Sequence, residues 1–124
     1  MEILDREALI KNLDRQSIDR LIHAKQRIQK TLAVEDAWLD FMSKVNFWEW
    51  ATEFYWDKDK MSIKEFAAFY FLINQIRKDG IKQPLKLKKN FHNEIWELGN
   101  GHHRLAIAEI LDIKKIPVTY YRNV

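Results

Sequence analysis

Glycine and proline are so scarce in this chain that they limit what it can fold into. Its 124 residues include three glycines and two prolines. Because these two residues most often interrupt regular backbone, their scarcity predicts long helices and strands and argues against a loop-rich or disordered chain. With 47% hydrophobic and 31% charged residues, the composition is that of a soluble globular protein, and the length fits one domain with its own core.

Composition also excludes several classes of function. The chain has no cysteine, which rules out disulfides, thiolate catalysis and Cys-ligated zinc or iron–sulfur sites. Its net charge of +3 is mild, so it is compatible with nucleic acid or nucleotide partners but does not require them. The N-terminal residues 1–14 are charged throughout, and no apolar run approaches the length of a membrane span. We therefore expect a cytoplasmic protein without a membrane partner.

The first 46 residues have the pattern of amphipathic helices. Apolar residues recur at helical spacing, at Ile10, Leu13, Ile18, Leu21, Ile22, Ile28 and Leu32. The Asp, Arg, Lys and Gln residues between them are typical of a solvated face. A break is expected near residues 14–17, because Asp and Ser favour helix starts, and a second start near residues 35–36. We expect a helical N-terminal layer over residues 1–61; a dimerisation arm or a partner-binding helix is the alternative.

Residues 47–56 contain six aromatic side chains in ten positions. On a helix these would cover most of the circumference, so the segment should be buried on several sides or should meet a partner. The interleaved charges are Glu49 and Glu53, which would repel the phosphates of a nucleic acid. The pattern therefore favours core or interface, and Trp48 and Trp50 are the candidates for binding a protein partner or a second copy.

The chain from residue 62 onward predicts a mixture of helices and strands. Ser62 and Glu65 form a capping-box pattern, and Gly80 is the expected helix stop. The predicted order is a helix, two strands, a helix and a last strand, over residues 62–78, 84–89, 94–98, 102–111 and 114–121. Residues 90–93 should form a turn, and Pro117 suggests that the last strand begins near a sheet edge. The predicted fold class is α+β, with residues 62–124 forming one compact unit with the helical layer.

Lysines alternate with leucines in the first of these strands. Lys86 and Lys88 face away from Leu85 and Leu87, and Lys89 follows. Such a row is typical of the solvated face of an edge strand, where it blocks pairing with other chains. The alternative is a groove for DNA, but no clustered acidic residues or catalytic motif support a nuclease.

The sequence Gly99-Asn100-Gly101-His102-His103-Arg104 separates the second strand from a helix. A Gly-rich turn at a helix N-terminus is suited to an anion, because backbone amides are free there and the helix dipole favours negative charge. The guanidinium of Arg104 matches the oxygens of a phosphate. The adjacent histidines diverge by about 100° on a helix, so no metal site is predicted. A structural role for at least one histidine is the competing interpretation.

The span from about residue 62 to residue 121 resembles the ParB/sulfiredoxin superfamily. The resemblance lies in the helix ending in Gly, the Pro-led strand, the second strand, the Gly-x-x-Arg-type loop and the closing "IPV" strand, in that order. The loop is most similar to the Asp-Gly-His-His-Arg version of ParB-like free amino-acid kinases, with Asn100 in place of the Asp. The sulfiredoxin reaction is excluded, because its Cys corresponds to His102.

The resemblance implies a nucleotide-binding function. It implies phosphate contacts from Gly99, Gly101, His102, His103 and Arg104, with ATP or CTP and Mg²⁺ as cofactors and a phosphotransferase or nucleotide hydrolase as the activity. In that case His103 and Asn100 are the candidate catalytic residues, and His103 would position or protonate the phosphates. Asn100 stands where a carboxylate would act, and an amide cannot be a general base. The alternative is a non-catalytic interaction module, such as a small phage or mobile-element regulator, that uses Trp48 and Trp50.

Overall fold

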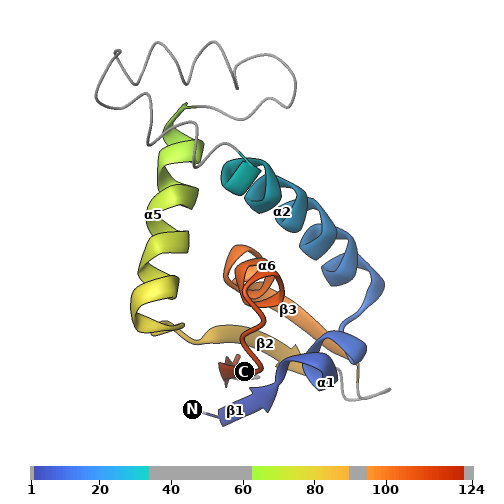
Figure 1. The fold of residues 1–124 in the computed structure, drawn as a ribbon. Coiled ribbons are helices and arrows are strands. Elements are labelled where there is room, and N and C mark those ends of the chain that lie inside the picture. The colour runs from blue at the N-terminus through green and yellow to red at the C-terminus, as the bar shows by residue number, and fades with distance from the viewer. Residues whose placement is uncertain (1, 34–62, 90–94, 122–124) are drawn as a thin grey trace, which may run out of the picture.

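The computed structural model describes residues 2–33, 63–89 and 95–121 of the chain (Figure 1). Several expectations lie outside these residues. They are the helix start near 35–36, the aromatic segment with Trp48 and Trp50, the Ser62 cap, and the turn at 90–93.

The described residues form one mixed sheet and four helices, which confirms the α+β class. In chain order the elements are β1 (Glu2–Asp5), α1 (Arg6–Lys11), α2 (Arg15–Ala33), α5 (Ile63–Asp79), β2 (Leu85–Lys89), β3 (Trp96–Asn100), α6 (His102–Ile110) and β4 (Lys115–Tyr120). The sheet order is β1-β4-β2-β3, with β4 antiparallel to β1 and parallel to β2, and β2 antiparallel to β3. From α5 to β4 the elements follow the predicted helix–strand–strand–helix–strand order.

Helix α6 is the centre of the fold. It lies between the sheet on one side and the helices α2 and α5 on the other (Figure 1). Its residues Leu105, Ala106, Ile107 and Ala108 are fully buried, and they share one core with the buried leucines of β2 and β3. An apolar circumference is stable only when it is covered from several sides, and this arrangement explains why the helix has so few polar positions.

The sequence analysis predicts helices from the start of the chain, but the first described residues form a strand. Glu2–Asp5 form β1, which pairs with β4 from Glu2↔Val118 to Asp5↔Lys115. The apolar spacing on which the helix prediction rests begins only at Ile10. The four residues of β1 are held by pairing with a distant strand, and such tertiary pairing overrides local preference.

Pro117 does not mark an edge, because β4 is an inner strand between β1 and β2. The parallel pairing with β2 begins at Leu85↔Val118, so the missing N–H of Pro117 falls just before the ladder starts. The lysine row is likewise on an inner strand rather than an edge, although Lys86, Lys88 and Lys89 are exposed as predicted. Strand β3 also continues through Gly99 and Asn100, where the sequence predicts a break.

The outer edge of β3 is closed by the connection between α1 and α2. The Trp96 N–H donates to the Asn12 carbonyl at 2.7 Å, and the Asp14 N–H donates to the Trp96 carbonyl at 2.8 Å. Asp14 also caps α2, because its Oδ1 accepts the Ser17 N–H at 2.8 Å, which agrees with the predicted break. Buried Ser17 in turn accepts the Leu98 N–H on its Oγ at 2.9 Å. These bonds fix α2 over α6.

Candidate functional site

Gly101 starts α6 in a conformation that other residues rarely adopt. Its φ is +112°, and a Cβ at this position would lie 2.6 Å from Leu85 Cγ. Glycine is therefore required both for the backbone conformation and for the close approach to β2. The Leu105 N–H donates to the Gly101 carbonyl at 2.9 Å, so the amides of His102, His103 and Arg104 make up the first turn. The predicted turn opening a helix is present.

Arg104 points into the protein rather than toward a ligand. Only 9% of it is exposed. Its Nη1 donates to the carbonyls of Gln83 and Pro84 at 2.5 Å and 2.9 Å, and its Nη2 donates to Asn100 Oδ1 at 3.3 Å. The guanidinium thus holds the segment before β2 against the start of α6. Arg104 and Asn100, predicted as phosphate-binding and catalytic residues, bind each other.

The contact with Gln83 follows from the proline in β4. The Tyr121 N–H donates to the Leu87 carbonyl, and the two-residue period of a strand would place the donor of position 117 opposite the carbonyl of Gln83. Pro117 has no N–H to give. Arg104 supplies the donor from the helix instead. The sequence predicted a ligand contact for this guanidinium because its carbonyl acceptors, in Gln83 and Pro84, lie 21 and 20 residues away in the chain.

Gly99 makes room for a neighbouring ring. A Cβ on Gly99 would lie 2.2 Å from Cε2 of Tyr121, so the tyrosine side chain lies directly over this glycine. Gly99 lies in β3 and does not line the pocket between α2 and α6 that is described below. Its predicted phosphate contact therefore has no counterpart in that pocket.

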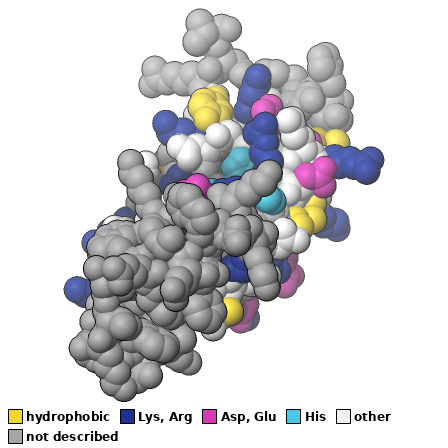
Figure 2. All heavy atoms as spheres, turned by 90° about the horizontal axis from the view of Figure 1, so that it is seen from above, with side chains coloured by type: hydrophobic (Ala, Val, Ile, Leu, Met, Phe, Trp, Pro, Cys, Tyr) yellow, Lys and Arg dark blue, Asp and Glu magenta, His cyan; other side chains and the backbone are white. Residues whose placement is uncertain are grey.

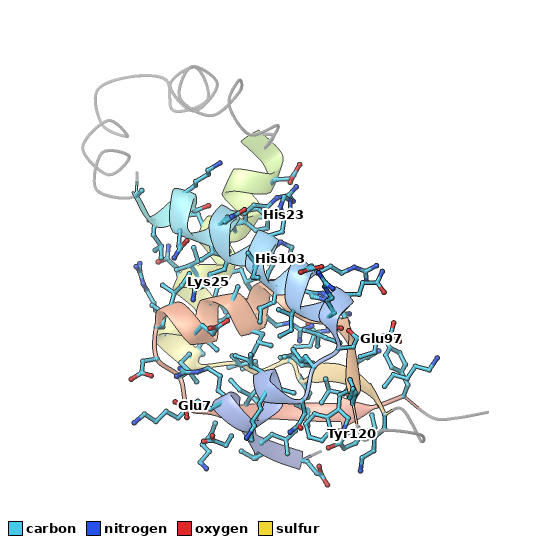
Figure 3. The ribbon with its side chains drawn as sticks, turned by 90° about the vertical axis from the view of Figure 1, so that its right-hand side faces the viewer. Glu7, His23, Lys25, Glu97, His103 and Tyr120 are labelled. Atoms are coloured by element: carbon cyan, nitrogen blue, oxygen red, sulfur yellow. The ribbon has the colours of Figure 1, made fainter. Side chains whose placement is uncertain are left out.

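His102 and His103 line a pocket of about 420 Å³ between α6 and α2. The other wall is formed by α2, with Gln16, Asp19, Arg20, His23, Ala24 and Arg27. From above, His side chains come to the surface beside Lys or Arg side chains (Figure 2). Figure 3 shows His23 of α2 above His103 of α6, on the side where the two helices meet. The pocket thus brings together three histidines and two arginines.

Sequence reasoning missed the α2 wall of this pocket. Arg20, His23 and Arg27 follow one another at spacings of three and four, which puts them on one side of a helix. That side flanks the buried stripe of Leu21, Ala24 and Ile28. The spacing was visible in the sequence, but a solvated helix face has the same pattern until a second element lies beside it.

Burial and nearby cations favour the neutral form of both histidines of α6. Burial lowers the pKa of His102, and the charge of Arg20 lowers it further. Burial is also the main reason that the pKa of His103 is lowered, followed by Arg27, His102 and His23, with Glu65 acting in the opposite direction. A neutral histidine offers one N–H donor and one acceptor. An anion between these groups would reverse the shifts, because it favours the charged forms.

The two histidines differ in their contacts. The His103 ring stacks on Phe69 of α5 with centroids 4.7 Å apart. The Nε2 atom of His102 is buried and has no hydrogen-bond partner in the part of the chain that the structure describes. A buried polar atom without a partner is unusual and is a reason to expect a ligand or a solvent molecule there.

The pocket suits an anion better than a metal ion. Among residues 2–33, 63–89 and 95–121, no three His, Asp or Glu side chains are grouped so that they could hold a metal. Asp19 is the one carboxylate among the lining residues.

In the same ranges, no helix combines the length and the apolar character that a membrane crossing requires.

Comparison with protein-family profiles, with curated proteins and with solved structures found no match for this chain.

Proposed function

We propose that the protein binds the phosphates of a nucleotide in the pocket between α2 and α6. The observation that carries the proposal is the convergence of Arg20, Arg27, His23, His102 and His103 on one pocket at the start of α6. Arginine and histidine donors are the groups that recognise phosphate oxygens, and a helix N-terminus adds free amides and a favourable dipole. A volume of about 420 Å³ lies within the range of small-molecule sites.

The proposal keeps part of the predicted phosphate loop and replaces the rest. His102, His103 and the amides of the first turn of α6 remain ligands of the nucleotide, and Gly101 remains the residue that permits the turn. Arg20 and Arg27 are the arginines of the site in place of Arg104, whose guanidinium bonds with Gln83, Pro84 and Asn100. A ParB-like nucleotide protein remains our interpretation of the loop, with the α2 arginines as an addition to it.

The residues fit ATP or CTP, with Mg²⁺ held chiefly by the nucleotide itself. Magnesium in such sites is bound by one or two carboxylates together with the phosphates, and Asp19 is available for that purpose. Asn100 accepts a hydrogen bond from Arg104 and lies outside the pocket lining. We therefore propose binding as the function; phosphate transfer or hydrolysis would need a base other than Asn100.

Calorimetric titration tests the proposal. ATP, CTP, GTP and ADP are titrated with and without Mg²⁺ into the wild-type protein and into Arg20→Gln/Arg27→Gln. Saturable binding by the wild type, weakened about fiftyfold in the double variant, is expected from the loss of two arginines that line the pocket. The matched control is Arg15→Gln, which removes an exposed arginine of α2 outside the pocket lining.

Absence of binding by the wild type would overturn the proposal. So would equal loss in the Arg15→Gln control, which would indicate general charge attraction rather than a site. Release of inorganic phosphate is measured in the same samples, so that binding and turnover are separated.

A further inference from the structure

We propose that the pocket binds its nucleotide in one direction, with the phosphates at the end formed by Arg20 and His102 and the nucleoside at the end formed by Arg27 and His103. This inference rests on the proposed function. Arg20 and Arg27 are seven residues apart on α2, which is about 10 Å along the helix axis. The pocket therefore has two ends, and their contacts differ.

The Arg20 end holds charge and polar atoms that the protein leaves without partners. Arg20 makes no ion pair or hydrogen bond with any residue of the chain that the structure describes. His102 Nε2 is buried without a hydrogen-bond partner among the residues that the structure describes. Burial, and after it the charge of Arg20, lowers the pKa of that ring. A phosphate here would carry the charge opposite to that of Arg20 and would accept hydrogen bonds from the guanidinium and from the His102 ring, which lines the pocket.

At the Arg27 end of the pocket, the arginine already has a carboxylate partner within the protein. Arg27 Nη1 lies 3.3 Å from Glu65 Oε2 of α5, so a carboxylate already faces this arginine. Next to it His103 stacks on Phe69, so its ring is packed against an aromatic side chain. A phosphate placed here would be repelled by Glu65. An uncharged group with a flat face and hydroxyls suits this end better.

Asp19 also lines the pocket and would oppose a phosphate. It is rotated by about 100° from Arg20 around α2, away from the buried stripe of the helix, so it stands at the outer rim. When no Mg²⁺ is present to lie between Asp19 and the phosphates, removing this charge should strengthen phosphate binding. Asp19→Asn therefore tests whether the anion lies at this end, with a change opposite in direction to that of Arg20→Gln.

The experiment compares a ligand that has only phosphates with one that also has a nucleoside. Inorganic pyrophosphate and ADP are titrated without Mg²⁺ into the wild type, Arg20→Gln, Asp19→Asn and Arg27→Gln/Glu65→Gln, which removes the ion pair as a unit. Arg20→Gln should weaken both ligands about tenfold, and Asp19→Asn should tighten both about threefold. Arg27→Gln/Glu65→Gln should change pyrophosphate affinity by less than twofold and weaken ADP about fivefold.

The outcomes separate the two proposals. If the wild type binds neither ligand, the proposed function fails. If the wild type binds both but Arg20→Gln and Arg27→Gln/Glu65→Gln weaken pyrophosphate equally, the site stands and the direction is wrong. The direction is also wrong if pyrophosphate is lost only in Arg27→Gln/Glu65→Gln. Circular dichroism of each variant establishes that the fold is retained, as expected for changes at partly exposed side chains.

Discussion

At the scale of single residues, Arg104 is predicted to contact a phosphate, whereas in the structure its guanidinium donates hydrogen bonds to two backbone carbonyls. Replacing it with Ala would leave the carbonyls of Gln83 and Pro84 without their side-chain donor and would open space beside α6. We expect Arg104→Ala to lower the free energy of unfolding by about 2–4 kcal/mol. Urea denaturation measures this loss, with Arg15→Ala as the exposed control expected to change stability by about 0.5 kcal/mol or less. An unchanged urea midpoint for Arg104→Ala would contradict the assigned role.

The two left-handed glycines allow conformational strain to be separated from crowding. A Cβ on Gly101, which has a φ of +112°, would lie 2.6 Å from Leu85 Cγ. A Cβ on Gly80, which has a φ of +74°, would have no atom of the described residues within 4 Å. We expect Gly80→Ala to cost about 1 kcal/mol of stability from the backbone alone. Gly101→Ala should cost about 3 kcal/mol, because β2 must also move. Thermal denaturation of both variants gives the comparison, and equal losses would show that Leu85 yields without cost.

At the scale of elements, one hydroxyl joins α2 to the edge of the sheet. Ser17→Ala removes the acceptor of the Leu98 N–H and leaves that buried donor unpaired. We expect a loss of about 1–2 kcal/mol, concentrated at β3. Amide hydrogen exchange gives the specific readout, because the Leu98 amide should lose protection. The matched control is Asp14→Ala, which weakens the cap of the same helix but keeps the bond to Leu98.

The sequence predicts some of the secondary-structure elements and not others. Helical spacing and strand alternation identified α2, α5, α6, β2 and β4, because each of these carries its burial pattern in its own sequence. Strand β1 has no such pattern, since its four residues are held by β4. The pocket could not be predicted for a similar reason. The first-turn histidines were recognised, but the function of Arg20 and Arg27 depends on where α2 lies relative to α6.

For the whole molecule, acid should have opposite effects on stability and on anion binding. Burial lowers the folded-state pKa of His102 and His103 below the usual 6.5, so the unfolded chain binds more protons between those values. Stability from these groups is complete above about pH 6.5 and is lost as the pH falls toward the folded-state pKa. A bound phosphate favours the protonated rings, so its affinity should rise over the same interval.

Thermal denaturation and pyrophosphate titration between pH 5.5 and 8 measure the two trends on one sample. The variant His102→Gln/His103→Gln should flatten both, because it removes the titrating groups and retains Arg20 and Arg27. Parallel trends in the wild type, or trends that persist in the variant, would assign the pH dependence to other residues.

The pairing of β1 with β4 has a consequence for how the chain folds. Glu2 of β1 pairs with Val118 of β4, and all the other described elements lie between these two strands in the sequence. Contacts between such distant residues are slow to form, because the entropy of closing a long loop is lost before the contacts stabilise it. Pairing of β1 is therefore expected to be a late step of folding, later than the local contacts between β2 and β3. The buried stripe of α2 likewise stays uncovered until the distant helix α6 packs against it.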